Sequence, residues 1–212
     1  GDTVVMATVV MSGKVREGID YLPLLVDYEE KLYAAGKIKG SRWIKREGRP
    51  SDEAILSGRV TDRTFRPLFD ERVRNDIQVV VTVLSVDGDN DPDIIGLNAA
   101  SAAIEISDIP WAGQVAAVRV GKVNGEFVLN PSFAAIEKES SLDLIVAATR
   151  EHIVMLEAGA SEVSEEVLLS AIEYGQKEIG KIIDAIHDLE KKIGRPKSET
   201  IRFEASSEVK EK

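Results

Sequence analysis

The sequence has no cysteine, few aromatic residues and no long apolar run. Only 5% of its 212 residues are aromatic, and two are histidines. Because cysteine is absent, the chain forms no disulfide and has no thiolate nucleophile, which fits the reducing cytoplasm. Its apolar stretches, such as residues 77–84, are far shorter than the roughly 20 residues that cross a bilayer. We therefore expect a globular, cytoplasmic protein with no membrane partner.

Common catalytic and metal-binding motifs are also missing. The chain has neither a Gly-x-x-x-x-Gly-Lys loop nor a Gly-x-Ser-x-Gly turn, so the usual nucleotide hydrolases and esterases lack support. His152 and His187 have no partner pattern, and we interpret both as structural or surface residues. Acidic residues alternate from Asp87 to Asp93 as in a calcium loop, but Pro92 falls where that loop needs glycine. A turn followed by a helix cap explains this stretch better.

Charge is unevenly distributed along the chain. The formal net charge of −10 argues against a surface covered with nucleic acid, because phosphate contacts need clustered Lys and Arg. Residues 37–74, however, hold eleven Lys or Arg against six Asp or Glu, a net charge of +5 that leaves −15 for the rest. Two interpretations remain open for this segment: a solvated basic face or a phosphate-binding surface.

Extended segments and a long loop are predicted in the first half of the chain. Residues 1–11 have the composition of a buried strand that starts inside a domain, and residues 19–28 that of a second extended segment. Residues 36–50 contain the glycines and charges of a long loop. The β-branched run 77–84 is typical of a central strand.

Helix starts are marked by capping residues. Ser51 is suited to cap a short helix that we expect to end near residue 59. Asp91 and Pro92 provide a cap and a first-turn proline for a second helix, which we expect to end near residue 106.

The second half predicts two hairpins and one long helix. Asn124-Gly125 divides residues 114–130 into a hairpin, and residues 142–148 and 152–158 form a second pair. From Ser164 the apolar period becomes helical up to residue 193. Residues 196–212 are polar and charged, so we expect a linker or frayed tail. Together these elements predict an α+β fold with a mixed sheet and a closing C-terminal helix.

The loop at residues 41–50 has the chemistry of a nucleic-acid contact. Arg42, Lys45, Arg46 and Arg49 surround the aromatic Trp43. Arginine and lysine neutralise phosphates and an indole stacks on a base, a combination suited to single-stranded RNA. The alternative is a solvated loop with Trp43 turned into the core.

Several motifs in one order carry a resemblance to a known family. The segment 33–50 resembles the loop of polynucleotide phosphorylases that ends in Glu-Gly-Arg-Pro. The match continues through residues 57–69, 90–93, 99–103, 128–131 and 142–149, and it covers about residues 1–195. The chain resembles the first of the two ribonuclease PH-like cores of these enzymes.

The resemblance implies a fold and a domain division. The expected fold is the ribonuclease PH-like core, a mixed β-sheet with packed helices that is also described as ribosomal protein S5 domain 2-like. Residues 1–140 are then the first core without its N-terminal strands, residues 141–195 its C-terminal part, and residues 196–212 a linker or the start of an all-helical domain.

The resemblance also implies a function for the whole enzyme. Polynucleotide phosphorylases hold two cores in one chain and three chains in a ring, and they degrade messenger RNA from its 3′ end. Inorganic phosphate, with Mg²⁺, releases nucleoside diphosphates in a catalytic site located mainly in the second core. The expected partners are single-stranded RNA, two further copies in a homotrimer, and other RNA degradation machinery.

Arginine and lysine residues carry the RNA-binding part of the resemblance. Lys45 and Arg46 match the basic pair of the family's loop, and Arg49 matches the arginine that follows it. Trp43 keeps one of the two usual aromatics, whereas Ile44 replaces the other. Further matching arginines are Arg59, Arg63 and Arg66. For these three, a structural salt bridge to Asp62 is the alternative to an RNA contact.

The catalytic part of the resemblance is incomplete. Pro92-Asp93 stands in place of the phosphate-binding serines, and Ile145 in place of the lysine. Asp143 matches one metal-binding aspartate and Glu137 lies near the position of the other. A carboxylate repels inorganic phosphate, so we expect no catalytic and no metal residue in this half. The alternatives are a self-sufficient ribonuclease PH-like exonuclease and a scaffold that binds RNA without turnover.

Overall fold

Two β-sheets and four α-helices make up the computed structural model, which describes residues 1–38 and 48–204. The first sheet has the strand order β1-β3-β2 and the second the order β5-β4-β6-β7. The strands are β1 (Val4–Val15), β2 (Leu24–Glu30), β3 (Asn75–Ser85), β4 (Ala116–Val123), β5 (Glu126–Leu129), β6 (Ser140–Ala148) and β7 (Ile153–Ala160). The helices are α1 (Asp52–Phe65), α2 (Pro92–Ile106), α3 (Phe133–Glu139) and α4 (Glu165–Ile193), with short 3₁₀ turns η1 (Leu32–Ala35) and η2 (Arg66–Leu68).

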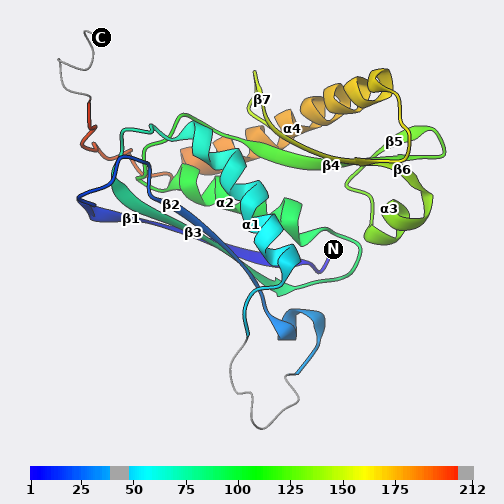
Figure 1. Cartoon of the computed structure of the whole chain (residues 1–212), viewed down its shortest axis with the longest axis horizontal. Coiled ribbons are helices and arrows are strands. Elements are labelled where there is room, and N and C mark those ends of the chain that lie inside the picture. Colours follow the sequence, from blue (N-terminus) through cyan, green and yellow to red (C-terminus); the bar gives the residue numbers. More distant parts are fainter. Residues whose placement is uncertain (39–47, 205–212) are drawn as a thin grey trace.

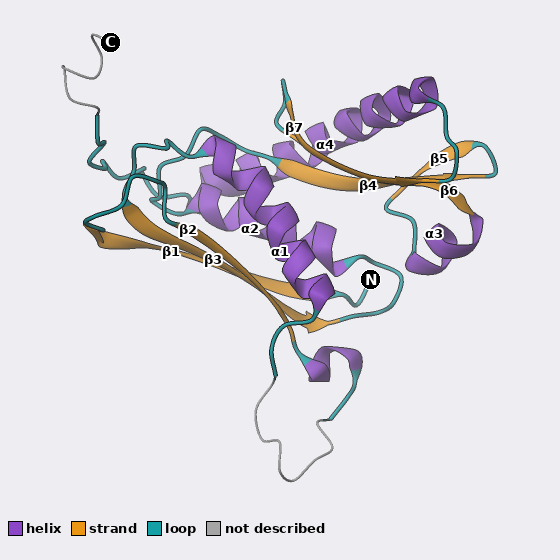
Figure 2. Ribbon diagram, in the orientation of Figure 1, coloured by secondary structure: helices purple, strands orange, loops and turns teal. Residues whose placement is uncertain are grey.

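The elements form four layers. Helices α1 and α2 lie between the two sheets, and α4 covers the other face of the second sheet (Figure 1). Strand β4 contributes side chains to both hydrophobic clusters: Ala117 packs in the first and Val118 in the second. The resulting mixture of strands and helices, seen in Figure 2, confirms the predicted α+β fold and its closing C-terminal helix.

Strand β3 is the centre of the first sheet. It pairs antiparallel with β1 and parallel with β2, so the prediction of a central strand is confirmed. The prediction that residues 1–11 form a buried strand is wrong. Strand β1 lies at an edge of the described sheet, and its alternate side chains Val4, Met6 and Val10 are exposed. The second extended segment is confirmed, although β2 begins later than expected, at Leu24.

Helix α1 starts as predicted and ends later. The Ser51 hydroxyl accepts a hydrogen bond from the backbone N–H of Ala54 at 3.0 Å, which is the expected cap. The helix continues to Phe65, six residues beyond the predicted end at 59, because no helix-breaking residue intervenes before Pro67. Gly58 faces β2, where an added Cβ would make an ordinary van der Waals contact of 3.6 Å with the Val26 carbonyl oxygen.

The predictions of the second helix and of both hairpins are confirmed. Helix α2 begins at Pro92 behind the Asp91 cap and ends at Ile106. Strands β4 and β5 form the first hairpin, and its turn residues Asn124 and Gly125 have φ angles of 52° and 89°. Strands β6 and β7 form the second hairpin.

Helix α4 packs closely on the second sheet. Its buried stripe includes Ile179 and Ile183, as the helical period predicts. Gly175 sits against the sheet, because an added Cβ would lie 3.2 Å from methyl groups of Val120 and Val146. Across the described ranges, the search for a helix both long and apolar enough to cross a membrane finds none.

Of the two alternatives predicted for this segment, a linker or a frayed tail, the contacts of residues 196–204 contradict the frayed tail. The Lys197 ammonium donates to the carbonyl oxygens of Ile104, Glu105 and Ser107 at 2.9, 2.8 and 3.0 Å. These carbonyls end α2, where a cation is favoured by the helix dipole. Further along, the backbone N–H of Phe203 donates to the Arg72 carbonyl at 3.0 Å. The segment, called the strap below, therefore connects the end of α4 to the end of α2 and to the residues that precede β3.

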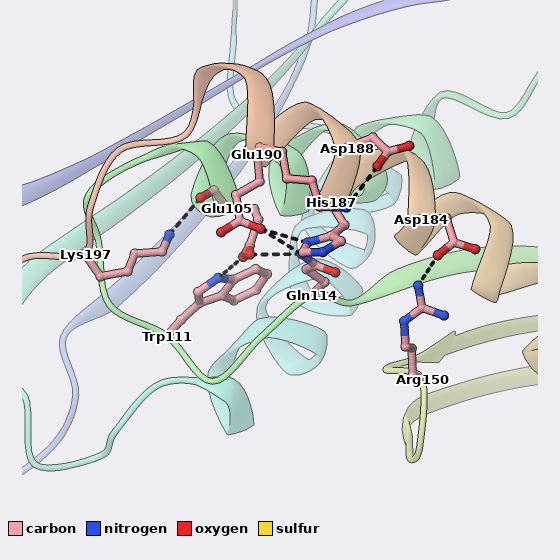
Figure 3. Close-up of polar contacts among 10 residues, drawn as sticks. Glu105, Trp111, Gln114, Arg150, Asp184, His187, Asp188, Glu190 and Lys197 are labelled. Atoms are coloured by element: carbon pink, nitrogen blue, oxygen red, sulfur yellow. Dashed lines mark hydrogen bonds and ion pairs between the residues drawn. The ribbon is translucent and has the colours of Figure 1, made fainter.

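A polar cluster joins the ends of α2 and α4 beside this strap (Figure 3). The Glu105 carboxylate accepts from the Trp111 indole at 2.5 Å and from the Gln114 amide at 3.1 Å. The same amide lies 3.1 Å from Nδ1 of His187, which is 3.0 Å from the Glu190 carboxylate. Because His187 is half-exposed and its Nδ1 contacts this cluster, its interpretation as a structural or surface residue is supported.

Candidate functional site

Two of the predicted arginines, Arg59 and Arg63, lie on one face of α1, and a third, Arg66, is the C-cap residue of this helix. Arg59, Arg63 and Arg66 follow the helical repeat, and all three are exposed. They line one side of a groove of about 510 Å³, and strand β2 lines the other. The structure therefore brings together three residues that the sequence did not place on one helix, because the predicted helix ended near residue 59.

Arg66 is held by the protein itself. Its guanidinium donates two hydrogen bonds to the Asp62 carboxylate, at 3.0 and 2.6 Å. It donates two more to the carbonyl oxygens of Leu22 and Leu24, at 3.2 and 3.1 Å. These bonds join α1 to the start of β2. The structural salt bridge to Asp62 is thus confirmed for Arg66.

Arg59 and Arg63 differ from Arg66 in their surroundings. Neither side chain has a hydrogen bond, ion pair or ring contact with any residue in the described ranges. Both guanidinium groups consequently present all their donors to the groove and to solvent. That these two residues contact RNA stays a prediction.

The predicted loop is described only at its ends. Arg42, Trp43, Lys45 and Arg46 lie outside the described residues, within 39–47. The exposed Arg49 is described, and it lines a second groove of about 840 Å³ together with Lys37 and the first residues of α1. This groove shares Glu29, Pro50 and Ala54 with the groove beside Arg59, so the two adjoin.

A buried ion-pair centre lies at the other side of α1 and α2. The Arg119 guanidinium on β4 bridges Asp91 at the start of α2 and Asp143 on β6. Its Nη1 lies 2.7 Å from Oδ2 of Asp91, and its Nε lies 3.1 Å from Oδ1 of Asp143. The Arg119 and Asp91 side chains are only 12% and 4% exposed.

The electrostatics of this centre are dominated by carboxylates. Burial raises the pKa of Asp91 above its ordinary value; the Arg119 charge opposes that shift, whereas the charges of Asp93 and Asp143 add to it. The Asp93 carboxylate accepts a hydrogen bond from the Ser57 hydroxyl at 2.7 Å. A cavity of about 180 Å³ beside Asp93 and Arg119 is also lined by Glu53 and Glu157. Three carboxylates, those of Glu53, Asp93 and Glu157, line the cavity beside a single guanidinium, which makes it unsuitable for inorganic phosphate.

The residues of this centre do not fit a divalent metal ion. Asp143 is paired with Arg119, and Glu137 is an exposed residue of α3. Among the residues that the structure describes, no group of three or more His, Cys, Asp or Glu is placed to hold a metal. The interpretation of Asp143 as a structural residue is therefore supported by its ion pair.

Arg119 is the important residue that the sequence reasoning missed. A signal for it exists: a single arginine interrupts the apolar run from Ala116 to Val120. A charge in a strand buried on both faces needs a counter-charge, so its presence predicts acidic partners from elsewhere in the chain.

Comparisons with known proteins agree with this geometry. Residues 1–110 match the model of the 3′ exoribonuclease family, domain 1, and residues 113–178 match that of domain 2. The crystal structure of rice Rrp46 is similar, with a TM-score of 0.72 and 20% identity over 90% of this chain and 85% of that chain. At this identity the likeness shows the fold, which confirms the predicted ribonuclease PH-like core.

Closer relatives are bacterial proteins named polyribonucleotide nucleotidyltransferase. That of Acidobacterium capsulatum is 54% identical over 197 residues, 93% of this chain and 24% of the relative. That of Halothermothrix orenii is 50% identical over 211 residues, 100% of this chain and 30% of the relative. The chain thus spans less than a third of the length of these relatives, which agrees with a single core half.

Proposed function

The chain belongs to the 3′ exoribonuclease family, and from this premise we propose that it is the RNA-gripping first core of a polynucleotide phosphorylase. Its relatives bear the name of an enzyme, polyribonucleotide nucleotidyltransferase. We assign to this half the binding of single-stranded RNA, and to the remainder of the protein the phosphorolysis that releases nucleoside diphosphates from the 3′ end. Mg²⁺ and inorganic phosphate are then used by that remainder.

The observation that carries this proposal is the pair of unpartnered arginines on α1. Arg59 and Arg63 lie one helical turn apart beside a groove, and the described structure engages neither of them. An RNA backbone supplies the anionic oxygens that such guanidinium groups bind. Arg49 adds positive charge to the adjoining groove.

The acidic centre supports binding without turnover. Asp93 stands where an incoming phosphate ion would need donors, and Glu53 and Glu157 line the same cavity. Phosphoryl transfer needs positive charge at the reacting oxygens. The one guanidinium of this centre, Arg119, is already shared by two carboxylates.

Assembly into a ring of three is part of the proposal. The exposed apolar residues Val4, Met6 and Val10 lie on one face of β1, an arrangement typical of surfaces that become covered in an assembly. The compartment proposed for the assembled protein is the cytoplasm, in line with the absence of cysteine.

Salt dependence of RNA binding tests the gripping role. We would measure the affinity of the 212-residue chain for fluorescent oligoadenylate by anisotropy at several NaCl concentrations. For single strands, log K falls with log[salt] with a slope of about −0.7 per neutralised phosphate. The double variant Arg59→Ala/Arg63→Ala should therefore weaken binding and flatten the slope by about 1.4.

A matched variant controls for net charge. Arg16→Ala/Arg150→Ala removes the same charge from exposed arginines that are paired with Asp76 and Asp184. It should leave the slope near that of the wild type. Equal changes in both double variants would contradict the proposed interface, because the effect would then come from overall charge.

A further inference from the structure

Three sequence motifs of the polynucleotide phosphorylase resemblance meet at one residue, Arg119. Asp91 comes from residues 90–93, Asn130 from 128–131 and Asp143 from 142–149. Asp91 and Asp143 are the ion-pair partners of Arg119. Asn130 fixes the backbone of the same residue, because its side-chain oxygen accepts from the Arg119 N–H at 2.9 Å and its own N–H donates to the Arg119 carbonyl at 2.7 Å. Each of the three motifs therefore supplies a residue that contacts Arg119.

An aromatic ring completes this setting. The Arg119 Cζ atom lies 5.7 Å from the centroid of the Phe133 ring on α3, within the range of a cation–π contact. Helix α3 follows directly after Asn130 and the Ser132 cap, so the chain that fixes the Arg119 backbone also places the ring. Arg119 is thus held from α2, α3, β4 and β6.

The buried carboxylate of Asp91 needs a cation beside it. Asp91 is almost completely buried, and Asp93 and Asp143 lie close enough for their charges to act on it. An isolated buried carboxylate costs several kcal/mol, so a positive group has to accompany it. A guanidinium or a divalent metal ion satisfies this need, but two cations a few ångströms apart repel each other. The position is therefore filled by one or the other.

We propose that Arg119 takes the place of a divalent metal ion in this centre, so that this half of the protein binds no Mg²⁺ between Asp91 and Asp143. The guanidinium is covalently part of β4 and stays charged at all physiological pH values. It joins the start of α2 to the second sheet without an ion from solution. The centre holds two layers of the fold together, and this structural role does not depend on RNA binding.

The first test is a titration with Mn²⁺ alone, followed by the electron paramagnetic resonance signal of the free ion. Wild type and Asp143→Asn should bind the same amount of Mn²⁺, because no ion uses Asp143 in the wild type. Specific binding by the wild type that Asp143→Asn removes would overturn the proposal. This comparison needs no variant of Arg119.

The second test removes the guanidinium. Arg119→Met keeps an unbranched side chain but leaves the carboxylates without a counter-charge, so the variant should gain a Mn²⁺ site. At about 100 times the dissociation constant, bound Mn²⁺ should raise its Tm by roughly 5 to 10 °C. The added change Asp143→Asn should abolish that rise.

The outcomes of this second test separate cleanly. Folding of Arg119→Met only in the presence of Mn²⁺ would also support the proposal. A folded Arg119→Met whose Tm does not respond to Mn²⁺, or responds equally with Asp143→Asn, would overturn it. If Arg119→Met does not fold in either condition, the titration of wild type against Asp143→Asn decides. RNA affinity is not measured in either test, so failure here is distinct from failure of the proposed function.

Discussion

Replacing Arg66 with alanine is expected to destabilise the fold, whereas the same change at Arg63 is not. The Arg66 guanidinium donates four hydrogen bonds, two to the Asp62 carboxylate and two to the carbonyls of Leu22 and Leu24. Arg63 donates none to the described residues. The two residues are less than one helical turn apart and both are exposed, so they form a matched pair that differs in hydrogen bonding.

The magnitude follows from the type of each bond. The exposed i,i+4 ion pair with Asp62 contributes about 0.3–0.5 kcal/mol. A hydrogen bond from a charged donor contributes about 1.5–3 kcal/mol when desolvated, but the Arg66 side chain is 43% exposed, so the two bonds to carbonyls count for less. We expect a total loss of about 2 kcal/mol for Arg66→Ala. In a protein of this size that lowers Tm by roughly 4–8 °C.

Thermal unfolding followed by circular dichroism measures this difference. Arg63→Ala should stay within about 0.5 kcal/mol of the wild type, as surface substitutions usually do. RNA affinity should show the reverse order, with the larger loss in Arg63→Ala at a temperature where both variants are folded. A Tm of Arg66→Ala within 1 °C of the wild type, or an equal fall in Arg63→Ala, would refute the assignment of structural and binding roles.

Two further predictions concern the strap and the turn before α2. Lys197→Ala removes three charge-assisted hydrogen bonds to the end of α2 and should release the strap. Limited digestion with chymotrypsin should then cut after Phe203 faster than in the wild type. An unchanged rate of cleavage would count against the strap. The backbone N–H of Asn90 holds the pKa of the Asp87 carboxyl well below its ordinary value. Such a group stabilises the fold above its unfolded pKa of about 3.9, and this contribution is lost as the pH falls below that value. Asp87→Asn should therefore be less stable than the wild type at pH 7 in urea unfolding, and the difference should shrink below pH 4; a difference independent of pH would contradict the assignment.

Elements specified by nearby residues could be predicted from the sequence. Ser51 and Asp91 cap the helices that follow them, and Asn124-Gly125 adopts the positive φ angles of its hairpin turn. In each case the determining atoms lie within a few residues of one another, so a local pattern carries the information. The polynucleotide phosphorylase resemblance added the fold, because the ordered motifs fix the connectivity of these elements.

Features that depend on distant partners could not be predicted. The carbonyls that bind Lys197 lie about 90 residues earlier in the chain, so its polar surroundings in sequence indicated only a loose tail. The exposure of alternate residues on β1 depends on its edge position, which strand composition does not specify. Likewise, Asp62 four residues before Arg66 indicates an ion pair, but the bonds that tie Arg66 to the carbonyls of Leu22 and Leu24 come from a distant part of the chain.

Incubation of the 212-residue chain with oligoadenylate, Mg²⁺ and inorganic phosphate tests the central claim most directly. The products are separated by chromatography, with a reaction lacking phosphate as the control. Our account predicts that the chain retains bound RNA, that Arg59→Ala/Arg63→Ala retains less of it, and that neither protein releases ADP. Phosphate-dependent release of ADP by this chain alone would contradict the account, because it would require a working phosphorolytic site in the half that we assign to RNA binding.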